Sequence, residues 1–478
     1  MSRNKIFKRN LVVSLILLFI IGCSTYYEST QDFQNYLMNG NFQQANQWLK
    51  NDKKGREGKN KLLHYLNRGY VAWMLDSTQK SNEYFHEADR IIEDYLKNYS
   101  LEALALVSNP NVKPYSPEDF EAVMLYYYTA LNYIKMGNYE DALVECRRIN
   151  IRLQELNDKY KDHKNKYQRD AFAHYLMGMI YETNANFNDA FIAYRNAYEA
   201  YKEDYTEYFN MTVPDQLKHD LLRAAYLTGF SEEVAYYEKE FGIDYEYQPK
   251  ENGELIVLWL NGFGPIKDEN VIQFSKGMSG ENGYITLSSG DEGMNFPVYM
   301  GDKSAKEKTA LSNLSFFKIA LPKYVERKPV YKRGKIYRNG EKMKMEMAQD
   351  VNEIAFKTLR DRLIRELSNA ILRVAIKKAL EELIKEQDET LGMIANWVNT
   401  ATEKADTRNW QTLPYSINVS RIPLEKGKNT VKLKTYRKNG TEKTLQFFVD
   451  GKNNKTIFKA IHTYQCYLPG QASLVSSQ

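Results

Sequence analysis

The sequence predicts a multidomain protein in which an all-α array of helical hairpins precedes an α+β domain. Small and aromatic residues recur at fixed spacings in the first half, and turn residues followed by apolar runs appear after about residue 244. A long amphipathic stretch then lies between segments that alternate apolar and polar residues. The predicted boundaries are 32–243 for the helical array and 254–470 for the α+β domain. A chain of 478 residues is long enough for two or three domains.

The N-terminus has the features of a secretory signal. An apolar run, Leu11 to Ile21, follows four positive residues: Arg3, Lys5, Lys8 and Arg9. The run is shorter than the roughly 20 apolar residues that span a bilayer. Its ending, Ile20-Ile21-Gly22-Cys23, resembles a bacterial lipobox, in which the cysteine is acylated and becomes the new N-terminus. We therefore expect a lipoprotein signal peptide over 1–22, lipid on Cys23 and a tether over 23–31. An ordinary signal peptide and a single-span anchor are the alternatives.

This interpretation decides the compartment. Ser24 follows the cysteine, whereas an Asp there would resemble an inner-membrane retention signal. We expect a protein of the bacterial cell envelope, anchored in the outer membrane and facing the periplasm. Bacterial lipoproteins carry three acyl chains, and two or more chains give a firm anchor.

Charge and cysteine content narrow the possible partners. The formal net charge is +5, but the signal segment holds four of the positive residues and leaves about +1. No net basic field remains to attract nucleic acid, so we expect no nucleic-acid partner. Cys146 and Cys466 remain after Cys23 is lipidated, and the sequence does not show whether they pair. Cys146 falls at a helix-packing position, which favours a buried free thiol.

Internal repeats predict the helical array. Gly178 is followed at steps of three, twelve, sixteen and nineteen by Tyr181, Ala190, Tyr194 and Ala197. The same steps lead from Ala130 to Tyr133, Ala142, Cys146 and Ile149, and from Gly69 to Ala72, Ser81, Phe85 and Ala88. This spacing resembles the tetratricopeptide repeat, in which small residues let two antiparallel helices approach and aromatic residues fill the groove beside them.

The turns between the predicted helices support the repeats, although the period is irregular. Gly40-Asn41, Gly137-Asn138 and Asn184-Ala185-Asn186 stand where left-handed backbone is needed. Successive copies are separated by 36, 61 and 48 residues, whereas regular arrays step by about 34. We predict a degenerate solenoid of helical hairpins; a plain helical bundle is the alternative.

The second half opens with strands. Leu255 to Leu260 is an unbroken apolar run that predicts a buried strand, and further strands are predicted at Tyr284–Leu287 and Phe296–Met300. Asn339-Gly340 is typical of a hairpin turn. These elements place strands over 255–340.

Helices and then strands complete the α+β domain. Over 347–385, apolar residues near one face predict a long amphipathic helix of roughly 55 Å, and a second helix is predicted over 391–403, so that helices occupy 347–404. Alternating residues predict strands over 414–450 with a turn at Lys438-Asn439-Gly440. We expect all strands of this domain in a single sheet.

Catalytic and metal-binding motifs are nearly absent. His86-Glu87 lacks the second His of a zinc protease, and no Cys pair has ligand spacing. Gly277 to Gly280 lacks the final Gly of a nucleophile elbow, because Glu281 stands there. Asn261 to Gly264 is weak evidence for phosphate binding, since a proline follows instead of a helix. We expect no catalytic residues, no metal and no cofactor.

One short junction combines polar and aromatic residues. Ala405 to Trp410 (Ala-Asp-Thr-Arg-Asn-Trp) leads from the predicted helix into a strand. Asp406, Arg408 and Trp410 form either a structural corner, with an ion pair capped by the aromatic ring, or a small polar site. An ion pair of this kind is weak evidence for stability or function.

Four segments together resemble a known family: the lipobox, the repeats, Ile319 to Tyr324 (Ile-Ala-Leu-Pro-Lys-Tyr) and the Ala405–Trp410 junction. Their order is similar to that of the bacterial tetratricopeptide-repeat-type outer-membrane lipoproteins of unassigned function. The resemblance implies a layout and a compartment but no activity. It also implies proximity to lipoprotein activators of peptidoglycan synthases, and thus an envelope partner in cell-wall synthesis.

We therefore expect a lipid-anchored, non-enzymatic scaffold that binds other proteins through the repeats. By analogy with tetratricopeptide proteins, the first helix of each pair lines the concave groove, so Tyr127, Tyr175 and Met179 are candidates for partner contact. Packing of these residues inside the protein is the alternative. A peptidoglycan or glycan binder that uses Trp259, Trp397 and Trp410 as stacking rings, and an enzyme acting on envelope polymers, are the rival functions.

Overall fold

The computed structural model describes residues 25–97, 113–159, 166–279, 284–288, 295–299, 316–387, 404–452 and 454–467, with single residues at 305, 308 and 311. The predicted signal peptide, Cys23 and the predicted helix over 391–403 lie outside these ranges. Among the helices described, none is both long and apolar enough to cross a membrane.

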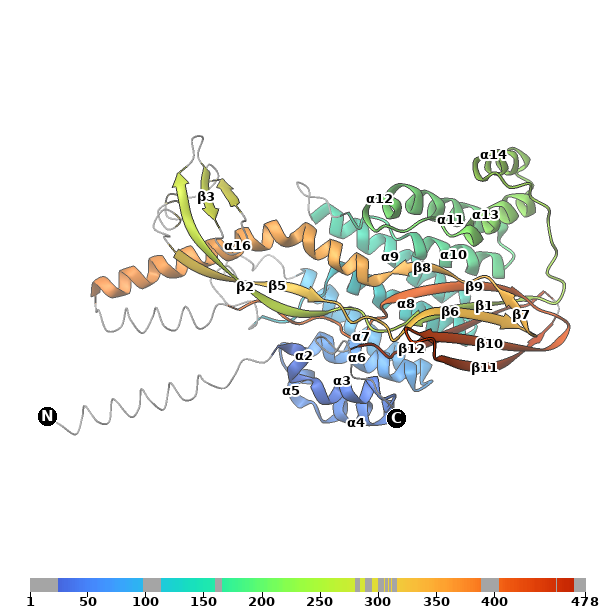
Figure 1. Cartoon of the computed structure of the whole chain (residues 1–478), viewed down its shortest axis with the longest axis horizontal. Coiled ribbons are helices and arrows are strands. Elements are labelled where there is room, and N and C mark those ends of the chain that lie inside the picture. The colour runs from blue at the N-terminus through green and yellow to red at the C-terminus, as the bar shows by residue number, and fades with distance from the viewer. Residues whose placement is uncertain are drawn as a thin grey trace.

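Helices make up the first half, as predicted. In chain order they are α2 (Tyr26–Ser29), α3 (Gln31–Met38), α4 (Phe42–Asn51), α5 (Lys53–Glu57), α6 (Lys61–Met74), α7 (Thr78–Lys97), α8 (Asp119–Met136), α9 (Tyr139–Lys159), α10 (Ala171–Thr183), α11 (Phe187–Ala200), the π-helical turn η3 (Tyr201–Tyr205), α12 (Thr206–Tyr208), α13 (Asp215–Thr228) and α14 (Ser231–Phe241). The pairs α6–α7, α8–α9, α10–α11 and α13–α14 are successive antiparallel hairpins, and Figure 1 shows them side by side in a row.

The small residues of the repeat lie where two helices cross. A Cβ atom added at Gly69 would lie 2.5 Å from the ring of Phe85, and one added at Gly178 would lie 2.3 Å from the ring of Tyr194. These are the pairs separated by sixteen residues in the repeat pattern, so the predicted packing of small against aromatic residues is confirmed. Gly137 ends α8 in the left-handed conformation, with φ of 79°.

Three four-stranded sheets form the second half, so the prediction of a single sheet is wrong. The strands are β1 (Glu254–Asn261), β2 (Ile266–Ser279), β3 (Tyr284–Ser288), β4 (Asn295–Tyr299), β5 (Phe316–Val325), β6 (Tyr331–Arg338), β7 (Glu341–Met343), β8 (Glu346–Asp350), β9 (Ser416–Pro423), β10 (Gly427–Arg437), β11 (Glu442–Gly451) and β12 (Thr456–Thr463). We call β12-β1-β9-β8 the inner sheet, β11-β10-β6-β7 the outer sheet and β4-β3-β2-β5 the arm sheet. The alternation of apolar and polar residues within a strand does not show which strands pair. For example, β1 pairs with β9 and β12, which come from the far end of the domain.

The layers explain why β1 is a continuous apolar run. One face of the inner sheet packs against the helices and the other face packs against the outer sheet, through a core that includes Leu255, Val257 and Trp259. A strand that is buried on both faces has no polar side, and all eight residues of β1 are buried. Figure 1 shows the helices α8 to α13 on one side of the inner sheet and β10 and β11 on the other.

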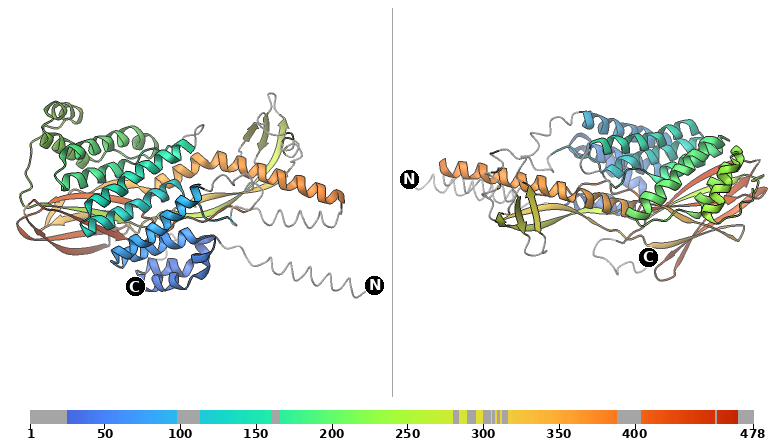
Figure 2. Two further views of the ribbon diagram at one scale, coloured as in Figure 1. Left: turned by 180° about the vertical axis from the view of Figure 1, so that it is seen from behind. Right: turned by 90° about the horizontal axis from the view of Figure 1, so that it is seen from above.

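The long helix α16 (Val351–Gln387) lies along β5 and extends with the arm sheet away from the three layers (Figure 2). Its predicted stripe faces this sheet, since Leu367, Ile371 and Val374 are buried against Ile319 and Phe317. The helix starts four residues later than predicted, because Met347 belongs to β8.

The predicted tether is also wrong over its described part. The Thr25 side chain caps α2 by accepting the N–H of Glu28 at 3.2 Å. The N–H of Tyr26 donates to Thr407 Oγ1 at 3.1 Å, and Thr30 is buried. Residues 25–31 are therefore part of the folded protein, and they contact the second half of the chain.

Candidate functional site

The inner sheet covers the face of the helical array where a partner groove was expected. The first helix of each hairpin contacts it. Tyr70 of α6 donates its hydroxyl to His462 Nδ1 of β12 at 2.9 Å, and Asp220 of α13 lies 3.0 Å from Arg421 of β9. Between these contacts, α8 and α10 pack on β1 and β9. The groove in which a partner was expected is filled by the chain's own strands.

The three candidate groove residues are consequently buried, and the expectation of an open groove is wrong. Tyr127 is 1% exposed, and Tyr175 and Met179 are 0% exposed. The Tyr127 hydroxyl donates to Asp170, and the Tyr175 hydroxyl donates to Asp220 at 2.9 Å. These side chains bond other helices, as the alternative of internal packing predicts, and they present no surface to a partner.

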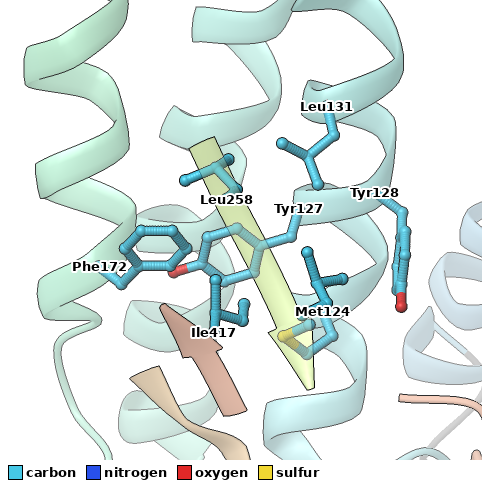
Figure 3. Close-up of a pocket in the computed structure, with 8 residues that line it drawn as sticks. Met124, Tyr127, Tyr128, Leu131, Phe172, Leu258 and Ile417 are labelled. Atoms are coloured by element: carbon cyan, nitrogen blue, oxygen red, sulfur yellow. The ribbon is translucent and has the colours of Figure 1, made fainter. Parts of the chain in front are cut away.

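A cavity remains where α8 and α10 meet the inner sheet (Figure 3). Met124, Tyr127, Phe172 and Ile417 point into it, and its volume of about 10 Å³ leaves barely enough room for one water molecule. Its walls are apolar side chains and tyrosine rings. This cavity is a packing defect at the joint between helices and sheet, too small to hold a substrate.

A buried cluster of six charged residues joins the helices to the inner sheet. Arg421 of β9 is at its centre, with its Nε 3.0 Å from Glu254 of β1 and its Nη1 2.9 Å from Glu182 of α10. Arg223 of α13 bonds Glu182 at 2.6 and 2.8 Å and Asp220 at 2.7 Å. Lys250 completes the cluster, with Nζ 2.6 Å from Glu254. Three acids balance three bases.

The acids and bases of this cluster respond differently to burial. Burial alone would raise the pKa of Glu182, but Arg223 and Arg421 hold that pKa well below its ordinary value. Burial and the two neighbouring guanidinium groups lower the pKa of Lys250 to about 8. Each charge depends on its partners, so the cluster fixes the relative position of α10, α13, β1 and β9.

The Asp406–Trp410 junction is a structural corner. Arg408 Nε and Nη2 donate to the two carboxylate oxygens of Asp406 at 2.8 and 2.6 Å, and Nη1 donates to the carbonyl of Lys113 at 2.9 Å. Trp410 is 1% exposed, and its indole N–H donates to Thr412 at 2.7 Å. The predicted ion pair is present, but the ring over Arg408 belongs to Tyr115, at 5.6 Å, whereas Trp410 packs against Phe85 and Tyr128. The contacts of Arg408 connect the second half to the segment ahead of α8.

Two buried glutamates lie beside this corner, and their pKa values are shifted in opposite directions. Glu118 bonds Lys267 and lies 2.7 Å from Arg362, and these cations outweigh burial to lower its pKa to about 2. Glu121 accepts from the Tyr115 hydroxyl and from the N–H of Trp410 at 2.7 Å. Burial and the charge of Glu118 raise the pKa of Glu121 to about 7. The pair resembles an acid–base couple, but neither glutamate lines the cavity at the joint between helices and sheet.

Two cysteines and two of the tryptophans proposed as stacking rings are buried in the fold. Cys146 and Cys466 are buried and unpaired. Trp259 is 3% exposed and donates its indole N–H to Thr463 at 2.9 Å; with Trp410 buried as well, neither ring can stack on a sugar. Trp397 lies outside the described residues. No group of three or more His, Cys, Asp or Glu among those described could hold a metal ion.

Exposed aromatic side chains gather on the last hairpin, at the outer end of the row of helices (Figure 1). Tyr226 of α13 is 51% exposed, Phe230 of the turn 36% and Tyr236 of α14 59%. Tyr247, in the segment after α14, stacks on Tyr226 with ring centroids 5.1 Å apart. The same segment is rich in acidic residues: Glu232, Glu233, Glu238, Glu240 (which pairs with Lys202), Asp244, Glu246 and Glu251. We call Tyr226, Phe230, Tyr236, Tyr247 and these acids the terminal-repeat surface.

No family model matches the chain, and no curated protein matches it either. Solved structures match about half of it. A MamA double mutant from RS-1 is 15% identical, with 44% of this chain and 88% of that chain covered and a TM-score of 0.29. A tetratricopeptide repeat protein from Parabacteroides merdae is 15% identical, with 46% and 68% covered and a TM-score of 0.30. A putative kinesin light chain from Podospora anserina is 12% identical, with 45% and 92% covered and a TM-score of 0.29.

Sequence reasoning missed both the buried charge cluster and the terminal-repeat surface. Arg421 meets Glu182 across 239 residues, and no local spacing predicts such a contact. A charged residue such as Arg421, within a predicted strand, is an indication that a residue of opposite charge pairs with it inside the protein. The aromatic residues of the last hairpin, Tyr226, Phe230 and Tyr236, lie beyond the three repeat copies described above, and no spacing among them indicates whether their side chains are exposed.

Proposed function

We propose that this protein is a lipid-anchored, non-enzymatic scaffold of the bacterial cell envelope, and that it binds a protein partner through the terminal-repeat surface. The exposure of Tyr226, Phe230 and Tyr236 on the last hairpin carries this proposal. Clustered tyrosines are frequent at protein interfaces, because each offers a large apolar area and a polar tip.

The charge of this surface indicates the chemistry of the partner. Residues 226–251 contain seven acidic side chains against Lys239 and Lys250, and Lys250 is already engaged in the buried cluster. Aromatic faces and carboxylates both attract cations. We infer a partner that presents a segment rich in lysine or arginine.

Lipid on Cys23 would hold this scaffold close to the membrane. Only Ser24 separates Cys23 from Thr25, which caps α2 within the folded protein. The anchor therefore has almost no tether, and the partner would be met near the membrane surface. The resemblance of the sequence to envelope lipoproteins supports a partner in cell-wall synthesis.

Photo-crosslinking in intact cells tests the proposal. A photo-reactive side chain at position 230 or 236 is expected to capture the same envelope protein, whereas one at exposed position 54 of α5 is not. Replacing Glu232 and Glu246 with lysine should reduce that capture at least tenfold without changing the melting temperature. Equal capture from all three positions, or none with the folded lipoprotein present, would overturn the proposal.

A further inference from the structure

The outer sheet has one face that no described element covers. Along β10, Val431 and Leu433 point into the core between the sheets, while Lys432 and Lys434 alternate with them and point outward. The register extends this face across the sheet. Lys432 stands opposite Tyr337 of β6 and Gln446 of β11, and Lys434 stands opposite Lys335 and Thr444. Figure 1 places β10 and β11 on the side of the molecule away from α8 to α13.

This outward face is strongly basic, although the mature chain as a whole is almost neutral. The same register assigns it six cations: Arg333, Lys335, Lys342, Lys428, Lys432 and Lys434. Only two acids share the face in these strands, Glu442 and Asp450, and Glu442 pairs with Lys434 at 3.0 Å. The net charge of +4 is concentrated on a surface of four short strands. Net charge alone had concealed it, because the terminal-repeat surface holds a compensating excess of acids.

Aromatic rings lie between these cations. The Nζ of Lys434 lies 5.8 Å from the centroid of Tyr337, Lys335 lies 5.3 Å from Tyr436 and Lys428 lies 3.9 Å from Phe448. Phe448 is 55% exposed. Neighbouring strands are about 4.8 Å apart, and outward residues on one strand recur about every 7 Å. The face is therefore a grid in which positive charges and rings repeat at short intervals.

We propose that this basic face of the outer sheet binds an anionic polysaccharide, one whose sugar rings carry carboxylate or phosphate groups. Repeated lysines match repeated anions along a polymer, and aromatic side chains between them can pack on sugar rings. A lipid surface fits less well, because each of these rings lies beside a lysine and the face has no continuous apolar patch to enter a bilayer. The ligand would be separate from the partner of the terminal-repeat surface, so the two proposals stand or fall independently.

Binding of the full mature chain to polygalacturonate tests this inference. We expect saturable binding at low salt that weakens as ionic strength rises, since screening shortens the reach of surface charges. Fully methyl-esterified polygalacturonate, which has the same rings without the charge, should bind at least tenfold more weakly. The triple variant Lys335→Gln, Lys432→Gln, Lys434→Gln should lose at least tenfold in affinity for the charged polymer.

A matched variant and a competing surface make the test decisive. Lys50→Gln, Lys53→Gln, Lys54→Gln removes the same number of exposed lysines from α4 and α5 and should leave the affinity unchanged. Tyr337→Ser should weaken binding without altering its salt dependence. The inference is overturned if both triple variants lose affinity equally, if the wild type fails to bind, or if vesicles containing phosphatidylglycerol bind while polygalacturonate does not.

Discussion

At the scale of single residues, glycine at the crossing of two helices decides whether a hairpin can close. The ring of Phe85 occupies the space that a Cβ atom at Gly69 would need, at 2.5 Å. Gly69→Ala should therefore lower the free energy of unfolding by about 1–3 kcal/mol, although alanine is the better helix former. Urea denaturation measures this. In a Phe85→Leu background the cost should largely disappear; an equal cost in both backgrounds would exclude a clash with the ring.

A buried histidine gives the protein a defined response to acid. His462 donates its Nε2 proton to the Gly262 carbonyl at 2.8 Å, its Nδ1 accepts from Tyr70, and burial lowers its pKa to about 4. An unfolded chain binds this proton near pH 6.5, so unfolding takes up a proton between pH 6.5 and 4. The free energy of unfolding should therefore decrease as the pH is lowered. At pH 4.5 the loss from this group alone should be about 2.5 kcal/mol.

His462→Gln isolates this contribution, because glutamine can also donate to Gly262 and accept from Tyr70. Urea denaturation at pH 7.5 and pH 4.5 should show a smaller loss for the variant than for the wild type. If both lose the same stability, His462 does not remain neutral in the folded state.

The repeat residues could be predicted because their contacts are local. Gly178 meets Tyr194 sixteen residues later, and a fixed step in the sequence records that packing. Asp406 and Arg408 are two residues apart, so their pairing could be predicted as well. The burial of Tyr127 could not, because Leu258 and Ile417, which pack beside it around the cavity, follow more than a hundred residues later.

At the scale of elements, the charge cluster around Arg421 fixes the helices to the inner sheet. Removing one partner from a buried ionic cluster leaves the other charges uncompensated, which costs about 3–5 kcal/mol. Arg421→Met should lower the free energy of unfolding by that amount. Arg333→Met, at an exposed position of β6, should change it by less than about 0.5 kcal/mol. A loss below about 1 kcal/mol for Arg421→Met would show that the cluster contributes little to this joint.

Most elements could be predicted, but their pairing could not. The apolar run of β1 and the stripe of α16 reflect periodicity within one segment. The inner sheet, in contrast, brings together β1 and β12 in parallel from the two ends of the second half. Such long-range pairing leaves no local pattern, which is why three sheets were predicted as one.

At the scale of the whole molecule, the proposed lipid on Cys23 would determine where the two proposed surfaces operate. Cys23→Ala should move the protein from the membrane fraction to the soluble fraction, without changing the melting temperature of the folded protein. Mass spectrometry of the wild-type N-terminus should find acyl chains on Cys23 after loss of residues 1–22. An unmodified cysteine, or a Cys23→Ala protein still in the membrane, would contradict the lipobox interpretation.

The inner sheet covers the face of the helical array formed by α6, α8, α10 and α13, and so closes this face to a partner. The backbone runs from the last helix of the array, α14, to the first strand, β1, through residues 242–253. Cleavage at a protease site inserted after Gln248 therefore cuts the covalent link between the two halves of the described chain. After cleavage, we expect the halves to remain together in size-exclusion chromatography and to melt in one transition, as the uncut protein does. Separation into two folded pieces would contradict this arrangement, because the face formed by α6, α8, α10 and α13 would then be open to a partner.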